Sequence, residues 1–458
     1  MHWSFAGQSG TDAWRIRPVD EAFSYNFVDN NPRQAAPDDV GGNFKVASFN
    51  VLNYFTTLGE RGADSTAELD RQREKISAAI CALDADVVGL IEIENNGPMA
   101  VNDLLYGVNG INTQCGQYTF VSTGTIGTDA IAVAFIYKLA TTTTLGNYAV
   151  LDSSVDSRFN DDKNRPALAQ TFKQTPNGGV LTVVVNHLKS KGSACDDVGD
   201  PNLNDGAANC NLTRANAAAA MVDWLATDPT GSGDADFLII GDLNAYRNED
   251  PIDNIELGAD DTAGTADDYV DLLDANLGAD AYSFVFDGQL GYLDYALANQ
   301  ILNEQVTGVT SWHINADEVN IFDYNDDIQD PGEPSFFRES AALPIYEADA
   351  FRASDHDPVI VGFELDNDLD NDGVADDFDL CSDTVIPEAE PPNSKKNRFF
   401  VNADGQFVDG VGNLAGISIQ DTYGCSGIQI INAMGLGNGH VQQGITRGAL
   451  LDWIALNS

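Results

Sequence analysis

The stretch Phe237-Leu238-Ile239-Ile240-Gly241-Asp242-Leu243-Asn244-Ala245 decides how the fold of this chain is interpreted. Its four apolar residues and the glycine after them predict a short buried strand that ends where the backbone leaves a sheet. Asp242 and Asn244 stand two residues apart, so the alternation of a strand directs both side chains the same way. By itself the pattern fits two interpretations equally well: an ordinary Asp-x-Asn turn, or a functional site at a strand's carboxyl end.

Other predicted strands also end on polar side chains. Asn50, Glu92 and His187 each follow an apolar run, while Asp355 and His356 open another. A single histidine in such a place is more often structural, but two beside carboxylates and amides favour a site. Imidazole is the usual proton shuttle near neutral pH, and oxygen ligands without thiolates suit a hard cation such as Mg²⁺. We therefore expect metal-assisted acid–base chemistry at these strand ends.

Strands and helices alternate from Phe44 to about Leu365 without a regular strand–helix–strand repeat. The predicted strands cover residues 44–50, 87–93, 130–137, 181–187, 237–241, 292–298 and 358–364. Apolar residues at helical spacing predict helices over 66–83 and 213–226. This order favours an α+β fold, a four-layer α/β/β/α sandwich of two packed mixed β-sheets flanked by helices, over a single doubly wound sheet.

Composition divides the chain into four parts. Residues 1–42 are predicted to be an N-terminal remnant and linker, followed by a main domain over 43–365. Residues 366–381 form a short acidic segment. A small C-terminal domain is expected over 382–458, opening with a Pro/Glu linker and containing a helix near 443–456.

The charge is strongly acidic and unevenly distributed. The chain has 71 acidic and 23 basic residues and a net charge of −48, a balance that ordinarily argues against a nucleic-acid partner. Six of the basic residues, however, fall between Arg158 and Lys191, and none lies from Asn248 to Phe337. The local basic segment is compatible with an anionic substrate. The acidic remainder of the chain suits a salty or calcium-rich medium.

Cysteine usage points to an oxidising compartment. The six cysteines show no zinc-like spacing, so three disulfides in a secreted protein are expected, with fifteen connectivities open. The pairing of nearest neighbours would be Cys81–Cys115, Cys195–Cys210 and Cys381–Cys425. No run approaches the length of a membrane span, and the first residues do not resemble a signal peptide. We therefore expect a mature secreted form, with a monomer favoured and no membrane span.

The ordered motifs SFNVLN, DVVGLIE, VNHLKSKG, GDLNA and SDHDPV resemble those of the endonuclease/exonuclease/phosphatase superfamily. Deoxyribonuclease I and exonuclease III belong to it. The resemblance covers about residues 43–365, and the sequence around the motifs is most similar to secreted bacterial nucleases. It implies hydrolysis of a phosphate ester with a bound Mg²⁺, for which Mn²⁺ is an alternative.

The resemblance also implies a metal site and a catalytic pair. Glu92 would be the main Mg²⁺ ligand, with Asn50 and Asp355 nearby. His187 and His356 would flank the scissile phosphate as acid and base, in an order that the sequence leaves open.

The resemblance implies further catalytic roles, two of them from matches outside these five motifs. Asp242 and Asn244 would orient the attacking water and the phosphate. Asp294 would orient the histidine of SDHDPV, and Arg165 would reach a phosphate oxygen. Asp129 departs from the usual pattern, and we expect it either to orient the other histidine or to bind a further ion.

Two segments lie outside the minimal family pattern. The insertion closed by Cys195 and Cys210 would either clamp DNA or brace a long loop. The acidic segment reads Asp-x-Asp-x-Asp-Gly-x-x-Asp-x-x-Asp-x-Cys and resembles a thrombospondin type 3 calcium repeat, the alternative being a disordered acidic linker. The resemblance implies a structural Ca²⁺ held by Asp368, Asp370, Asp372, Asp376 and Asp379.

The leading functional hypothesis is a secreted, Mg²⁺-dependent nuclease that cleaves DNA endonucleolytically, with RNA as a further substrate left open. One alternative is a phosphoesterase for small or lipid phosphate substrates, because the superfamily includes such enzymes. The other is a calcium-dependent surface or adhesion protein with an inactive core.

Overall fold

The computed structural model describes residues 33–111, 115–325, 346–368, 370–375 and 378–457. It also describes the backbone of two short paired strands, β1 (His2–Ser4) and β2 (Ala13–Arg15). The proposed calcium ligand Asp376 and residues 326–345 lie outside the described residues. None of the helices in the described ranges is both long and apolar enough to cross a membrane.

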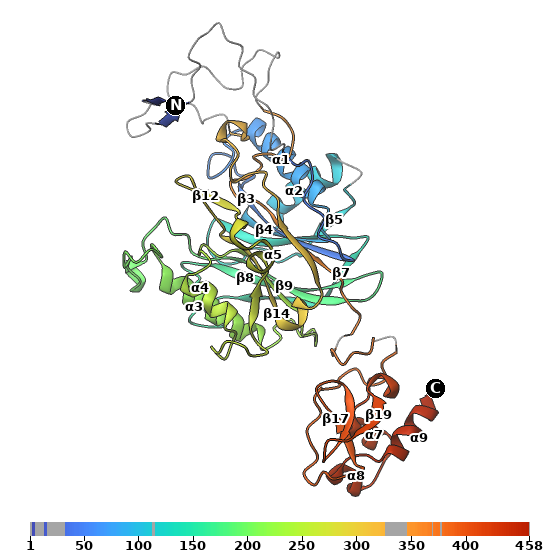
Figure 1. Ribbon diagram of the computed structural model, residues 1–458. Helices are drawn as coiled ribbons and strands as arrows, with labels where there is room; N and C mark the ends of the chain where they lie inside the picture. Colours follow the sequence, from blue (N-terminus) through green and yellow to red (C-terminus); the bar gives the residue numbers. More distant parts are fainter. Residues whose placement is uncertain are drawn as a thin grey trace.

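Two six-stranded mixed sheets form the main body (Figure 1). The first has the order β15 (Val306–Ser311), β16 (Val359–Phe363), β3 (Phe44–Tyr54), β4 (Val87–Glu94), β6 (Ile131–Lys138), β5 (Tyr118–Phe120). The second has the order β11 (Tyr269–Asp271), β14 (Asp294–Asn299), β10 (Phe237–Asp242), β9 (Val180–His187), β8 (Arg165–Gln174), β7 (Thr142–Leu151). Each sheet has one parallel pair at its centre, β3 with β4 and β9 with β10.

Helices cover the outer faces of both sheets. α1 (Thr66–Leu83) and α2 (Met99–Ile111) share a core with the outer face of the first sheet. α3 (Asn211–Leu225) and α4 (Asp250–Glu256) pack with the second. The short α5 (Leu272–Leu277), α6 (Gln300–Asn303), η1 (Asp196–Val198), η2 (Gly278–Asp280) and η3 (Asn320–Phe322) lie in connections. The predicted α+β sandwich of two mixed sheets flanked by helices is confirmed.

The two sheets pack closely at one glycine. A Cβ atom on Gly89 in β4 would lie 2.6 Å from Cδ1 of Ile240 and 3.1 Å from Cγ2 of Val185, which belong to the facing sheet. The absence of a side chain there lets the centre of β4 approach β9 and β10. The same close approach brings the carboxyl ends of the four central strands together.

Most predicted elements are confirmed within two or three residues, and some were missed. The unpredicted β7 and β8 carry many Thr and Gln residues, which weaken the apolar signal of a strand. The hairpin of β12 (Phe284–Phe286) and β13 (Gln289–Gly291) was also not predicted. It is exposed and too short for a periodic pattern.

A separate small core lies within residues 374–454 (Figure 1). It contains the sheet β17 (Phe399–Val401), β18 (Gln406–Asp409), β19 (Leu414–Ser418) and the helices α7 (Gly427–Ala433), α8 (Asn438–Gln443), α9 (Arg447–Asn457) and η4 (Gln420–Thr422). The helix predicted near 443–456 corresponds to α9. All six cysteines are paired, in the nearest-neighbour connectivity Cys81–Cys115, Cys195–Cys210 and Cys381–Cys425.

Candidate active site

One transverse row of the second sheet carries four polar side chains. The register places Arg165 of β8 opposite His187 of β9, His187 opposite Asp242 of β10, and Asp242 opposite Asp294 of β14. All four residues are buried. Because adjacent strands lie only about 4.8 Å apart, the register alone makes these side chains neighbours.

Gly241 and the turn after it set the direction of Asp242. Gly241 has φ 131°, and a Cβ there would lie 2.1 Å from the carbonyl oxygen of Asn186. Oδ1 of Asp242 accepts the backbone N–H of Asn244 (2.9 Å), and Nδ2 of Asn244 donates to the carbonyl of Leu188 (3.1 Å). This is an Asp-x-Asn turn, so the turn and the site are not alternatives: the turn leaves Oδ2 of Asp242 for the site.

The first sheet contributes Glu92, which ends the regular part of β4. Glu92 has a left-handed backbone (φ 65°) where the pairing of β4 with β6 shifts register. Such irregularities redirect a side chain at a sheet edge. Oε2 of Glu92 accepts the backbone N–H of Asn53 (3.0 Å), and Oε1 lies 3.9 Å from Nε2 of His187. The two sheets therefore meet through this carboxylate and this imidazole.

His356 is held by a buried carboxylate. Its Nδ1 lies 2.7 Å from Oδ2 of Asp294, which also accepts a hydrogen bond from Oγ of Ser283 (2.7 Å). The ring of Phe284 stacks on the imidazole at 4.6 Å between centroids. Burial acts to lower the pKa of His356, but the charges of Asp294, Asp355 and Asp242 outweigh it and hold that pKa well above its ordinary value.

His187 has the opposite electrostatic environment. Burial, followed by the charges of Arg165, His356 and Lys189, holds the pKa of His187 well below its ordinary value. Its Nε2 lies 3.6 Å from Oδ2 of Asp242 and 3.5 Å from Nη1 of Arg165. The pKa values of the two imidazoles are therefore shifted in opposite directions.

Asp129 contacts Arg165 instead of His187. Its Oδ2 accepts a hydrogen bond from Nε of Arg165 (3.1 Å), and its Oδ1 lies 3.5 Å from Nη1 of Arg61. Nδ1 of His187, which Asp129 was expected to hold, has no hydrogen-bond partner among the described residues. Asp129 is the anchor of Arg165, and the expectation that it orients His187 is wrong.

The donor atoms fit a divalent metal ion. Glu92, His187 and Asp242 each offer a ligand atom, and these atoms lie within 4.8 Å of one another. Burial, followed by the charge of Asp355, raises the pKa of Glu92, as expected where carboxylates meet without a cation. Asn50 is buried. Asn50 and Asp355 both act on the carboxylate of Glu92 and therefore lie beside it.

The acidic repeat contains a second group of donor atoms. Carboxylate oxygens of Asp368, Asp370 and Asp372 lie within 4.8 Å of one another. Oδ2 of Asp372 is buried and has no hydrogen-bond partner among the described residues. Oδ1 of Asp379 would lie 1.8 Å from a Cβ on Gly424, so this aspartate also faces the C-terminal body. The arrangement suits the hard oxygen chemistry of Ca²⁺.

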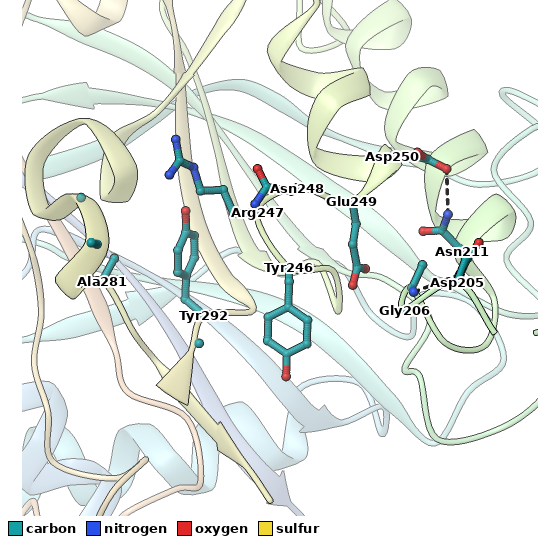
Figure 2. Close-up of a pocket in the computed structure, with 14 residues that line it drawn as sticks. Asp205, Gly206, Asn211, Tyr246, Arg247, Asn248, Glu249, Asp250, Ala281 and Tyr292 are labelled. Atoms are coloured by element: carbon teal, nitrogen blue, oxygen red, sulfur yellow. Dashed lines mark hydrogen bonds between the residues drawn. The ribbon is translucent and has the colours of Figure 1, made fainter. Parts of the chain in front are cut away.

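A groove of about 600 Å³ is lined by residues 246–250, which follow the GDLNA turn, and by Tyr292, two residues before Asp294. Figure 2 shows Arg247 and Tyr292 on one side, Asp205, Gly206 and Asn211 on the other, and Tyr246 and Glu249 between them. One wall belongs to the insertion closed by Cys195–Cys210.

A buried arginine anchors that insertion. Nη1 of Arg214 donates to the carbonyls of Lys189 (3.0 Å) and Asn209 (2.7 Å), and Nη2 donates to that of Ala207 (3.2 Å). The insertion is therefore held rigidly against the groove.

Three supporting residues were not found from the sequence. Ser283 and Phe284 position His356, and neither belongs to a motif. Oδ1 of Asp357 accepts three backbone N–H groups, those of residues 314–316, and so fixes the loop beneath SDHDP. For Asp357, the sequence offered one signal of this role: a second aspartate directly after the SDH triplet.

The chain belongs to the Endonuclease/Exonuclease/phosphatase family, whose model matches residues 47–356. The fold and the site therefore define a hydrolytic phosphoesterase of a family that includes nucleases. No curated protein sequence matches the chain.

Several solved structures are similar to this chain. The catalytic domain of human nocturnin is 13% identical over 70% of this chain and 94% of its own, with a TM-score of 0.42. An endonuclease/exonuclease/phosphatase from Bacteroides vulgatus is 16% identical over 70% of this chain and 99% of its own (TM-score 0.44). A mannosyl-6-phosphatase from Bacteroides thetaiotaomicron is 13% identical over 70% and 98% (TM-score 0.42).

Proposed function

We propose that the protein is a secreted nuclease that hydrolyses phosphodiester bonds of DNA with a bound divalent metal ion, Mg²⁺ or Mn²⁺. One observation carries the proposal: Oδ2 of Asp242 lies 3.6 Å from Nε2 of His187 and 3.9 Å from Nε2 of His356. Two imidazoles thus converge on one carboxylate beside Glu92. In-line attack on a phosphodiester needs a proton acceptor for the water and a proton donor for the leaving oxygen.

The electrostatics suggest which histidine has which role. His187, held neutral, would accept the proton of the attacking water that Asp242 and Asn244 orient. His356, held protonated by Asp294, would donate to the leaving oxygen. Glu92, with Asn50 and Asp355 beside it, would hold the metal ion, which when bound offsets the negative charge of the phosphoryl oxygens.

Basic groups beside the row support a polymeric anion as substrate. The charges of Arg165, Lys163 and Arg214 all act on Lys189 and, after burial, lower its pKa. Arg214 is buried and anchors the insertion, and Lys163 pairs with Asp197 (2.6 Å). Arg165 and Lys189 are therefore the cations left to meet a phosphate in a chain whose net charge is −48. Because the rest of the surface repels DNA, binding should involve few phosphates and depend only weakly on salt.

The groove favours a second candidate, a phosphoesterase for a small hydroxylated substrate. Carboxylates of Asp205, Glu249 and Asp250 line it, and such groups accept hydrogen bonds from sugar hydroxyls but repel further phosphates.

One experiment distinguishes the candidates. Supercoiled plasmid is incubated with Mg²⁺, with and without EDTA, using the parent protein and the variants His187→Ala, His356→Ala and His440→Ala. We expect nicking that EDTA abolishes, that the first two variants lose, and that the third retains because His440 lies in the C-terminal body. No nicking by the parent, together with turnover of sugar phosphates, would replace the nuclease by the second candidate. If the parent protein hydrolyses lipid phosphodiesters in vesicles and neither plasmid DNA nor sugar phosphates, both candidate functions are excluded.

A further inference from the structure

The hairpin of β12 and β13 is attached to the catalytic residues at its base. Ser283, directly before β12, donates to Oδ2 of Asp294 (2.7 Å), and its carbonyl accepts the backbone N–H of Asp357 (2.8 Å). Phe284, the first residue of β12, stacks on the imidazole of His356 at 4.6 Å between ring centroids. The position of the hairpin is therefore fixed relative to the histidine that would donate a proton to the leaving oxygen.

One face of the hairpin is turned toward the site. Phe284 lies opposite Gly291 in the pairing of the two strands, so both residues are on the same face. On that face Phe284 stacks on His356. A Cβ on Gly291 would lie 2.8 Å from Cε1 of Tyr246, which lines the groove. The alternation of a strand places Phe286 on this face as well, roughly 7 Å farther along β12.

Phe286 presents a large apolar ring to solvent. The residue is 63% exposed, although β12 begins against the buried catalytic row. Asp287 and Gly288 close the hairpin with a two-residue turn in which both residues have positive φ (50° and 74°), the turn geometry that suits a tight pair of strands. Leaving such a ring exposed forgoes the free energy of its burial, so a partner that covers it would gain that free energy.

The polarity of the hairpin favours an uncharged, flat partner. Asp287 stands beside Phe286, and the chain has no lysine or arginine from Asn248 to Phe337, so this segment offers a phosphate no counter-charge. A nucleobase is uncharged and has a π face that stacks on an aromatic ring. A lipid bilayer is a poorer partner, because the exposed Asp287 and Gln289 make the tip of the hairpin polar.

We propose that Phe286 stacks on a nucleobase beside the scissile bond and makes single-stranded DNA the preferred substrate, an inference that rests on the proposed nuclease function. Inside a duplex, neighbouring bases cover both faces of a base, so a single strand or an extruded base is needed to offer a free face. The stacking tolerates any sequence because every base has a π face. A supercoiled plasmid supplies unpaired bases where its strands separate locally.

The test compares the full-length parent with Phe286→Ala, Phe286→Trp and Leu290→Ala. Leu290 is the matched control, because it is 62% exposed and lies on the other face of the same hairpin, opposite Val285. Values of kcat/KM are measured in Mg²⁺ for a single-stranded oligonucleotide and for the duplex of the same sequence. Binding of the fluorescein-labelled single strand is measured in EDTA, so that it does not depend on cleavage.

The alanine variant should affect the two substrates unequally. Phe286→Ala should lower kcat/KM for the single strand, and weaken its binding, by roughly 5- to 150-fold, the equivalent of one base–aromatic stack. The loss for the duplex should stay below about twofold, because its bases are already stacked on one another. Phe286→Trp should retain both values of the parent, since an indole also offers a π face, and Leu290→Ala should match the parent throughout.

Two results would overturn the proposal. One is a Phe286→Ala variant whose kcat/KM is unchanged, or falls by the same factor for both substrates. The other is weaker binding of both alanine variants to phosphatidylcholine vesicles with unchanged DNA cleavage, which would assign the hairpin to a membrane surface. Failure of the proposed function looks different. A parent that binds the single strand through Phe286 without cleaving it would refute the nuclease and leave the stacking site, and a parent that neither binds nor cleaves DNA would refute both.

Discussion

The charge of Asp294 is expected to maintain His356 as a proton donor, and Asp294→Asn tests this. The change keeps the shape of the side chain but removes the charge from a 2.7 Å contact with Nδ1 of His356. With an effective dielectric constant of about 20, two unit charges at this distance attract by about 6 kcal/mol. Desolvation of the buried imidazolium offsets most of that attraction.

The net effect should therefore match that of a hydrogen bond to a charged group, about 1.5–3 kcal/mol. This corresponds to a loss of roughly 10- to 150-fold in kcat/KM at neutral pH. The sign of the pH dependence follows from the raised pKa of His356. Without Asp294 that pKa falls, so the limb on which activity declines with rising pH moves to lower pH. The deficit of the variant should narrow as the medium becomes more acidic.

Initial rates of plasmid nicking between about pH 5 and pH 9 measure this, with Ser283→Ala as the control. Ser283 donates to the same Oδ2 of Asp294 (2.7 Å), so its loss removes a neutral hydrogen bond and keeps the charge. We expect a smaller loss, roughly two- to twelvefold, that is nearly independent of pH. The reasoning is refuted if Asp294→Asn loses activity by the same factor at every pH, or if the two variants are indistinguishable.

Three further predictions concern stability. Gly89→Val should lower the free energy of unfolding, measured by urea titration, by about 1–3 kcal/mol, because the valine side chain would enter the space between the sheets. The control Gly110→Ala lies on an open helix face and should not lower the free energy of unfolding. Equal effects of the two would contradict the packing argument. Cys195→Ser/Cys210→Ser should cost about 3 kcal/mol and expose the insertion to proteases, and an unchanged midpoint would show that Arg214 alone holds it. Burial and neighbouring carboxylates raise the pKa of Glu256 to about 7, so its stabilising contribution is present below its unfolded pKa and is lost as pH rises through 7. Glu256→Gln should therefore raise the unfolding temperature at pH 8 but not at pH 4, and a shift at both would exclude titration as the cause.

Local sequence patterns predicted a strand correctly where the strand is apolar and a polar residue marks its end. The predicted starts of β3, β4, β10 and α1 coincide with the observed ones. Alternation and apolar runs act through neighbours along the chain, so they determine strand ends well. They failed for β7, which is polar and largely exposed, and for β8, whose Gln and Thr side chains are buried by neighbouring elements.

The sequence predicted the residues of the candidate site but not the contacts between them. The five motifs named the residues, but the partner of each residue depended on contacts that no local pattern encodes. Orienting His187 was one of two roles expected for Asp129, yet its carboxylate accepts a hydrogen bond from Arg165 in the fold. Phe284 lies in a three-residue strand, and nothing in its neighbourhood of the sequence indicated that it stacks on His356.

The sequence by itself determined which chemical groups stand at strand ends, and with them the family and the class of chemistry. Only the tertiary structure decided how these groups combine, because the register of β8, β9, β10 and β14 and the approach of the sheets at Gly89 join distant parts of the chain. His356 and Asp294 are separated by 62 residues. Burial of these groups in one place, and not their identity alone, shifts the pKa values of the two imidazoles in opposite directions, since desolvation and charge act through space. The Asp-x-Asn turn after Gly241 illustrates the division: its sequence predicted a turn, and its neighbours in the sheet made that turn part of a site.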